Sequence, residues 1–251
     1  MKRHIPNLIT LLNVFCGCIA AVYAVLNQLE LAAFFVFLGI IFDFFDGFAA
    51  RLLNVKSELG LQLDSLADMI TSGLVPGIVM FQLFAMSTTG GWNMTEGAFS
   101  PNVELFSNWN GNIVLPFFGF IITMASAYRL AKFNIDENQA SSFIGLPTPA
   151  NALLILSLPL ILLHHSLDGL NDIILNQWFL IVMTLVSAYL LNSKIELFAL
   201  KFKNWSFQDN ALRYIFIIVS LVLLITMKFL AVPVIIAFYI LSSILSKVAV
   251  K

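Results

Sequence analysis

Long apolar segments follow one another along almost the whole chain and constrain its fold more than any other feature. A transmembrane helix needs about 20 mostly apolar residues. Hydrophobic residues make up 60% of the chain and charged residues 11%, whereas a soluble domain has roughly 25% charged residues. The excess apolar surface therefore has to face lipid. Candidate spans lie near residues 9–27, 31–50, 64–86, 113–132, 149–164, 175–193, 212–227 and 230–247.

This pattern predicts an all-α, polytopic membrane helix bundle with about eight transmembrane helices. Lys and Arg near span ends collect on the cytoplasmic side of a membrane. Cytoplasmic N- and C-termini satisfy that rule for every basic residue except Lys228, which is expected outside. The basic residues expected inside are Lys2, Arg3, Arg51, Lys56, Arg129, Lys132, Lys194, Lys201, Lys203, Arg213, Lys247 and Lys251.

The chain shows no internal boundary. No linker, low-complexity tract or shift in composition divides it, so we expect a single integral membrane domain over residues 1–251. The basic start resembles a signal peptide, but Pro6 interrupts it and favours an uncleaved first helix. A net charge of -1 provides no field for nucleic acid, so no nucleic-acid partner is expected. Cys16 and Cys18 are too few and too close for a zinc site or a disulfide framework.

Four aspartates lie where the second predicted span ends and the third begins. Positions three or four apart share one face of a helix. Asp43 and Asp46 therefore form one stripe, and Gly60, Asp64 and Asp68 form another. The two stripes can meet across a helical hairpin. Acids in a membrane segment are costly, and neighbouring carboxylates repel each other unless cations compensate them.

This cluster predicts a divalent metal site. Carboxylate oxygens without nearby His or Cys suit Mg²⁺ or Mn²⁺ better than Zn²⁺ or Cu²⁺. Four aspartates could hold two ions about 3.5–4 Å apart, the arrangement that assists phosphoryl displacements. Gly47 and Gly60 permit close approach of a substrate, and Arg51 offers a positive fork for phosphate. Two alternatives remain: acids that cap helix ends at the membrane surface, and an ion site in an ion-coupled transporter.

The spacing of these residues forms a specific motif. It reads D-x-x-D-G-x-x-A-R from Asp43, then eight residues, then G-x-x-x-D-x-x-x-D ending at Asp68. This string resembles the signature of the CDP-alcohol phosphatidyltransferase family. The resemblance implies that four aspartates bind two divalent ions and that Asp68 also acts as general base. It further implies that the nucleotide of a CDP-activated lipid is framed by Gly47, Ala50, Arg51 and Gly60.

Segments outside the motif narrow the resemblance to the branch of the family that makes phosphatidylserine. They cover residues 5–17, 128–134 and 145–150. The implied family core is therefore about 5–152, with additional transmembrane helices at about 153–251. The implied reaction is transfer of a phosphatidyl group from CDP-diacylglycerol to L-serine with release of CMP. The implied location is a cell membrane, with the active site on the cytoplasmic side.

The same segments supply further candidate binding residues. Arg129 is the first candidate for the serine carboxylate, and Lys132 and Asn134 lie close to it in the sequence. That branch often has Arg where this chain has Lys132, which loses the bidentate fork. For the two cations, ordinary positive-inside anchoring is the alternative. Asn7 and Thr10 are candidates for the cytosine end of the CDP-lipid, with a helix N-cap as their alternative.

The motif identifies the CDP-lipid donor but does not identify the alcohol. Glycerol 3-phosphate or inositol phosphate is therefore the alternative acceptor. An ion-coupled transporter is less favoured because transporters often contain internal repeats, and the sequence shows none. The resemblance also implies a homodimer surrounded by membrane lipids.

Overall fold

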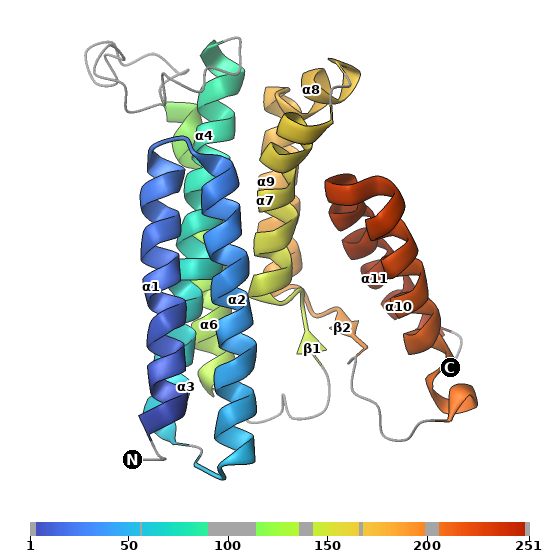
Figure 1. The fold of residues 1–251 in the computed structure, drawn as a ribbon. Helices are drawn as coiled ribbons and strands as arrows, with labels where there is room; N and C mark the ends of the chain where they lie inside the picture. The colour runs from blue at the N-terminus through green and yellow to red at the C-terminus, as the bar shows by residue number, and fades with distance from the viewer. Residues whose placement is uncertain are drawn as a thin grey trace.

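The structure is a computed structural model that describes residues 4–55, 57–89, 114–135, 143–165, 168–198 and 206–248. The fold is the predicted all-α helix bundle (Figure 1). The elements are α1 (Ile5–Val25), α2 (Leu29–Leu52), α3 (Glu58–Asp68), η2 (Met69–Leu74), α4 (Val75–Thr89), η3 (Leu115–Phe120), α6 (Ile121–Ile135), β1 (Phe143–Ile144), α7 (Thr148–His164), α8 (Asp168–Ile174), α9 (Gln177–Asn192), β2 (Glu196–Leu197), α10 (Phe207–Met227), η4 (Lys228–Leu230) and α11 (Ala231–Val248).

Helices occupy all of the predicted apolar stretches, and the protein is an integral membrane protein. The third stretch is divided into α3, the π-helical η2 and α4, and the fourth into the 3-10 helix η3 and α6. In the described part of the chain, four helical stretches are long and apolar enough to cross a membrane: Ile5–Val25, Leu29–Leu52, Glu58–Thr88 and Asn210–Ser246. The last is the α10–α11 hairpin. The number of crossings and the sides of the termini stay predictions.

Figure 1 shows α1, α2, α4 and α6 as one group of neighbouring helices, with α7 and α9 beside them and the α10–α11 hairpin farthest away. The main core lies between the group of α1, α2, α4 and α6 and the neighbouring α7 and α9. Its fully buried residues include Val36, Val79, Ile122 and Ile155, which come from α2, α4, α6 and α7. Hydrophobic side chains also cover the outside of the helices, as expected for a bundle whose solvent is lipid.

Small and polar residues bring α1, α2 and η2 close together near the middle of the bundle. The Thr71 hydroxyl donates a hydrogen bond of 2.8 Å to the side-chain oxygen of Asn13, and both residues are fully buried. A Cβ atom added to Gly39 would lie 2.7 Å from that same Asn13 oxygen. Close helix contacts in membranes depend on such small residues and interhelical hydrogen bonds. This contact sets how α2 and η2 lie against α1.

One pair of short strands and one short helix were not expected from the sequence. β1 and β2 pair antiparallel, with Phe143 opposite Leu197 and Ile144 opposite Glu196. α8 forms between the predicted spans 149–164 and 175–193. A strand of two residues is too short to show the alternating pattern by which a strand is recognised. The stretch between the predicted spans 64–86 and 113–132 lies mostly outside the described residues.

We expect Gly119→Ala to destabilise the bundle. Its new Cβ would lie 2.7 Å from the backbone nitrogen of Phe81 and 3.0 Å from the backbone carbon of Met80. Backbone atoms cannot rotate away, so the substitution should cost about 1–3 kcal/mol of folding free energy. The matched control is Gly169→Ala, because nothing lies within 4 Å of the added atom. Thermal unfolding of the detergent-purified variants measures both effects, and equal melting temperatures would contradict this packing.

Candidate active site

The predicted meeting of the two aspartate stripes is confirmed for three of the four residues. Asp43 and Asp46 lie on α2, and Asp64 lies on α3. One carboxylate oxygen from each of them lies within 4.8 Å of the others. α1 packs against both α2 and α3, and in this arrangement the Asp64 carboxylate of α3 reaches the two aspartates of α2.

Asp68 lies at the last position of α3, next to this cluster. Its Oδ2 accepts a hydrogen bond of 3.2 Å from the Thr148 hydroxyl at the start of α7. It also lies close to the Asp43 carboxylate. Asp68 is outside the tight group of three. Its place as a fourth metal ligand therefore stays a prediction.

The donor set is chemically suited to a divalent cation. Oδ2 of Asp46, within the cluster, and Oδ1 of Asp68, next to it, are buried and have no hydrogen-bond partner among the described residues. Buried acceptors are normally hydrogen-bonded, and a buried unpaired carboxylate is costly unless a cation lies close to it. These oxygens are hard ligands of the kind that Mg²⁺ and Mn²⁺ prefer. The cluster of Asp43, Asp46 and Asp64 could therefore hold a metal ion.

A π-helical segment follows Asp68 directly. η2 covers Met69–Leu74 and buries Thr71, Ser72 and Gly73. Each π turn contains more residues than an α turn, which changes the face on which later side chains lie, and such segments are frequent at functional sites. The π-helix thus separates a polar α3, which carries Asp64 and Asp68, from the apolar α4. Neither composition nor periodicity predicted it.

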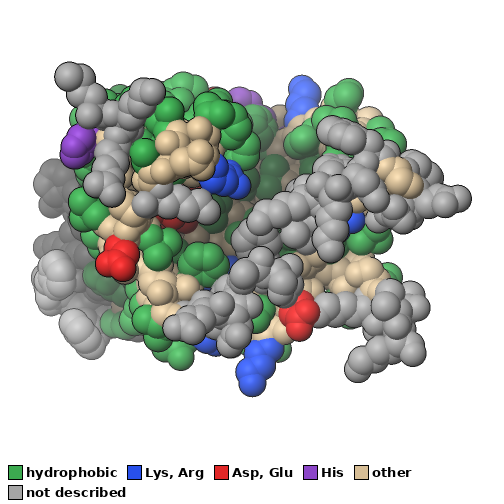
Figure 2. All heavy atoms as spheres, turned by 90° about the horizontal axis from the view of Figure 1, so that it is seen from below, with side chains coloured by type: hydrophobic (Ala, Val, Ile, Leu, Met, Phe, Trp, Pro, Cys, Tyr) green, Lys and Arg blue, Asp and Glu red, His purple; other side chains and the backbone are tan. Residues whose placement is uncertain are grey.

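The aspartates open into a cavity of about 710 Å³ at one end of the bundle. Figure 2 looks onto that end, where acidic and basic side chains lie among hydrophobic ones. The cavity also contains residues that the sequence analysis did not select, including Ser57, Glu58 and Phe133. The predicted residues that line it are Asn7, Thr10, Asp43, Asp46, Gly47, Ala50, Arg51, Gly60 and Asp64.

Local interactions shape the start of α3 at the cavity edge. Ser57 caps the helix, because its hydroxyl oxygen accepts a hydrogen bond of 3.1 Å from the Gly60 N–H. A Cβ atom on Gly60 would lie 3.3 Å from the side-chain oxygen of Asn7. A larger residue would therefore press against α1. A serine N-cap with an acidic residue in the first turn, here Glu58, is a recognisable helix-start signal. It does not reveal that Asn7 lies beside Gly60.

Arg51 and Thr10 both touch the chain close to the aspartates. The Nε of Arg51 donates to the Gly47 carbonyl at 2.9 Å, so the side chain folds back along α2. The Thr10 hydroxyl donates to the Pro6 carbonyl at 3.1 Å and also contacts the Asp46 carboxylate. A hydroxyl has one proton, so it can donate to only one of these oxygens at a time.

The alternative that Asn7 or Thr10 caps a helix is wrong. α1 begins at Ile5, its N-cap is His4, and no side chain makes a capping hydrogen bond there. Pro6 stands in the first turn, where its missing N–H costs nothing. Both Asn7 and Thr10 therefore lie inside α1, and both line the aspartate cavity.

The three predicted acceptor residues do not line this cavity. The Nη1 of Arg129 donates to two backbone carbonyls, those of Ile144 at 2.9 Å and Leu191 at 2.6 Å. Arg129 thus joins α6 to β1 and to the end of α9. Its remaining guanidinium donors still allow another contact. Lys132 is exposed. Sequence position shows that these residues share one end of α6 but cannot show which contacts occupy their side chains.

Asn134 makes a polar bridge between α6 and α3. Its side-chain oxygen accepts a hydrogen bond of 2.9 Å from the Ser65 hydroxyl, and its amide donates to Gln62 at 3.2 Å. Ser65 follows Asp64 directly. Asn134 therefore positions the helix that carries two of the aspartates, a role that the sequence analysis did not foresee.

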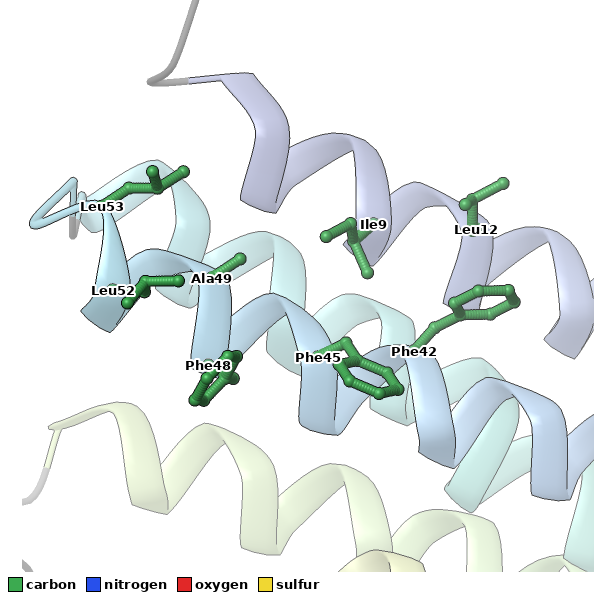
Figure 3. Close-up of a pocket in the computed structure, with 8 residues that line it drawn as sticks. All are labelled: Ile9, Leu12, Phe42, Phe45, Phe48, Ala49, Leu52 and Leu53. Atoms are coloured by element: carbon green, nitrogen blue, oxygen red, sulfur yellow. The ribbon is translucent and has the colours of Figure 1, made fainter.

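A second, apolar pocket lies on the other side of α2. It has a volume of about 340 Å³ and is lined by hydrophobic side chains of α1, α2 and the following Leu53. Figure 3 shows Ile9 and Leu12 of α1 beside Phe42, Phe45 and Phe48 of α2. Consecutive faces of α2 thus carry the aspartates and this apolar groove. The lining residues are Ile9, Leu12, Phe42, Phe45, Phe48, Ala49, Leu52 and Leu53.

The fold and site define an integral membrane helix bundle with a carboxylate cluster beside a polar cavity. Residues 3–190 match the profile of the CDP-alcohol phosphatidyltransferase family. The match covers well over half of the chain, so the protein belongs to this family. Enzymes of this family generally depend on a metal ion, in agreement with the aspartate cluster.

Three relatives of this chain share the same name. The chain is 32% identical over 151 residues to the CDP-diacylglycerol--serine O-phosphatidyltransferase of Bacillus subtilis (strain 168), which covers 59% of this chain and 70% of the relative. It is 32% identical over 167 residues to the enzyme of that name from Helicobacter pylori (strain ATCC 700392 / 26695), covering 65% of this chain and 61% of the relative. For the Saccharomyces cerevisiae protein of that name, identity is 30% over 171 residues, with 62% and 53% covered.

We expect Asp43→Asn to weaken Mn²⁺ binding by at least about tenfold, the effect of losing about 1.4 kcal/mol of ligand interaction. The substitution keeps the size of the side chain but removes one charged ligand from the group with Asp46 and Asp64. Electron paramagnetic resonance titration of Mn²⁺ into the detergent-purified protein measures the affinity. The control is Glu58→Gln, which removes a carboxylate from the same cavity but outside the cluster. Equal losses in both variants would contradict a site at the cluster.

Proposed function

We propose that this protein transfers the phosphatidyl group of CDP-diacylglycerol to L-serine and releases CMP. The observation that carries the proposal is the aspartate cluster beside an open polar cavity, in a chain of this family whose relatives from bacteria and yeast are named for serine transfer. The chain spans 70% of the Bacillus subtilis relative and less than two thirds of the other two relatives. The acceptor is therefore part of the proposal.

We assign the metal-binding role to Asp43, Asp46, Asp64 and Asp68, for two Mg²⁺ or Mn²⁺ ions. Bound divalent ions would neutralise the diphosphate of the CDP group and stabilise the leaving CMP. The protein contributes oxygen ligands from two helices whose relative position is fixed by packing. Support comes from the oxygens within 4.8 Å of one another and from the unpartnered Oδ2 of Asp46.

Asp68 is the proposed general base. It would accept the proton of the serine hydroxyl as that oxygen attacks the phosphorus next to diacylglycerol. A base needs one oxygen free for the proton and a fixed orientation. The Thr148 hydrogen bond holds Oδ2, and Oδ1 is without a partner among the described residues. The proton can then go to Oδ1 without breaking an existing contact.

The donor lipid would use both sides of α2. We assign the CDP group to the polar cavity, where Gly47, Ala50 and Gly60 leave space and Arg51 supplies positive charge. Asn7 and Thr10 line the same cavity on α1. An acyl chain would lie in the apolar groove next to Phe45 (Figure 3). A lipid headgroup in an aqueous cavity and a chain in lipid-facing apolar surface satisfy both parts of an amphipathic substrate.

The acceptor would approach from the side of α6. Arg129 remains the proposed partner of the serine carboxylate, through guanidinium donors other than the Nη1 that binds two carbonyls. Asn134 and Lys132 are proposed to lie near the acceptor, with Asn134 acting through its bridge to α3. A cation beside the acceptor would balance a carboxylate that otherwise adds negative charge to the aspartate cluster.

The remaining features of the proposal concern the whole protein. We infer a single domain over residues 1–251, with the family core at about 5–152 and further helices at about 153–251. The basic residues near the span ends support an active site on the cytoplasmic side of a cell membrane. A homodimer is proposed from the family resemblance alone.

Release of CMP from CDP-diacylglycerol tests the reaction. The detergent-purified protein with Mn²⁺ should release CMP with L-serine and only background amounts with glycerol 3-phosphate or inositol phosphate. A chelator should abolish the release. Activity with another alcohol would overturn serine as the acceptor, and no release with any acceptor would favour the transporter alternative.

Asp68→Asn should reduce turnover by about 10²–10⁴-fold, the usual contribution of a general base, without unfolding the protein.

Replacing Arg129 by lysine should raise the KM for serine more than the KM for the CDP-lipid. Lysine keeps a positive charge but cannot bind two carbonyls and a carboxylate through a planar fork. We expect roughly a tenfold increase for serine, equal to about 1.4 kcal/mol. Lys194→Arg is the control, because Lys194 is exposed and is not a proposed acceptor residue. A variant that loses stability but keeps the serine KM would show that Arg129 serves only to join α6, β1 and α9.

A further inference from the structure

A large apolar groove lies away from the aspartates, between the α10–α11 hairpin and the faces of α2 and α7. Its volume is about 760 Å³. Figure 1 shows the hairpin standing beside α7 as a separate pair of helices. Phe34 and Phe37 line the groove from α2, Leu153 and Leu160 from α7, and Ile235 from α11. The reaction proposed above uses none of these residues.

The length of the groove matches one leaflet of a bilayer. Its lining on α7 extends from Ala150 to Leu160, which corresponds to about 15 Å at 1.5 Å per residue. The hydrocarbon core of a bilayer is about 30 Å thick. Among the described residues of the lining, only Ser157 carries a hydroxyl, and it donates to the Leu154 carbonyl at 2.6 Å. Between Ala150 and Leu160, the described wall on α7 therefore presents no free polar side chain and suits an acyl chain.

The two charged residues in the described lining of the groove lie at one of its ends. Glu30 at the start of α2 and Lys228 between α10 and α11 both line it. Asp46 lies sixteen positions after Glu30 on the same helix, which corresponds to about 24 Å. The charged end is thus separate from the aspartate cluster. It is also the place of Lys228, the one basic residue that the positive-inside rule leaves on the outer side.

Lys228 takes a backbone conformation that favours glycine. Its φ is 49°, in the left-handed region that non-glycine residues seldom adopt. In the described part of the chain, no acidic side chain lies within ion-pair distance of its ammonium group. A strained backbone that holds an unpaired cation at the mouth of an apolar groove points to a ligand rather than to folding.

The other charge is held in place by neighbouring helices. One oxygen of Glu30 lies 3.2 Å from Nε2 of His164, and the His164 ring packs on Phe229 with centroids 5.0 Å apart. Nε2 of His165 contacts the Met227 carbonyl at 3.1 Å. These contacts tie the end of α7 to both α2 and the α10–α11 turn. Glu30 keeps its second oxygen for another partner.

We propose that this groove binds one phosphatidylethanolamine molecule of the outer leaflet, with an acyl chain along α7, the phosphate at Lys228 and the ammonium group at Glu30. One fixed anion and one fixed cation complement a headgroup that carries one of each. Phosphatidylglycerol has no cation for Glu30. Phosphatidylcholine has no N–H to donate to a carboxylate oxygen, and phosphatidylserine adds a carboxylate that has no second fixed cation.

Native mass spectrometry of the full chain, released from nanodiscs of equal parts phosphatidylethanolamine and phosphatidylglycerol, tests the proposal. The wild-type protein should retain one phosphatidylethanolamine, in preference to phosphatidylglycerol by about tenfold. Lys228→Met should lower retention by about tenfold, since a charged hydrogen bond is lost. Lys194→Met is the control, because Lys194 is exposed and does not line the groove. Equal retention of both lipids would overturn the proposal.

Two further variants separate lipid binding from folding. Lys228→Gly suits the left-handed backbone, so it should melt no lower than the wild type while losing the lipid. Leu160→Trp should fill the groove and exclude the lipid, whereas Ile225→Trp should not, because Ile225 is 79% exposed and lies outside the lining. Unchanged retention in Lys228→Gly and Leu160→Trp would refute the site. A dimer that Leu160→Trp dissociates would identify a second copy of the chain as the occupant instead. CMP release is independent of these outcomes.

Discussion

The mutual repulsion of carboxylates at the edge of an apolar bundle is the constraint on which the rest of this structure depends. Asp43, Asp46 and Asp64 place oxygens within 4.8 Å of one another. Lipid and protein around them screen such charges far less than water does. The helices therefore have to be held together by forces that do not involve the acids. Hydrophobic packing and close helix contacts provide those forces and leave the carboxylates available for cations.

The close packing of α1, α2 and η2 provides that framework. The buried Thr71–Asn13 hydrogen bond and the lack of a side chain at Gly39 bring the three segments together above the site. Near the cavity, Asn134 joins α6 to α3, and Thr148 reaches Asp68 from α7. Each contact comes from a different helix. The geometry of the aspartates is consequently a property of the bundle and not of the α2–α3 hairpin alone.

The two ends of the bundle carry different functional groups. Polar side chains and the aspartate cavity occur at one end, and the groove with Glu30 and Lys228 is open toward the other. The apolar groove of Figure 3 lies beside the aspartates. A protein whose proposed substrate is itself a membrane lipid needs apolar surfaces that accept single chains as well as surfaces that face bulk lipid. Both kinds of surface consist of apolar side chains, so they differ only in shape: one forms a groove and the other does not.

The helical fold followed from the sequence because lipid requires every backbone group to bond within its own helix, and long apolar runs show where those helices lie. The convergence of Asp43, Asp46 and Asp64 followed from their spacing on two consecutive helices. Helical periodicity is a local property and survives folding. The family could be recognised for the same reason, since eight specified residues lie within one hairpin.

Only the tertiary structure decided which distant residues reach this hairpin. Arg129 is occupied by the Ile144 and Leu191 carbonyls, and Thr148 meets Asp68 across 80 positions. The π-helix after Asp68 and the short β1–β2 pair also left no periodic signal in the sequence. Such contacts depend on the angles at which helices cross and on where each helix ends relative to its neighbours. Those quantities arise from packing between segments, which the order of residues within one segment does not encode.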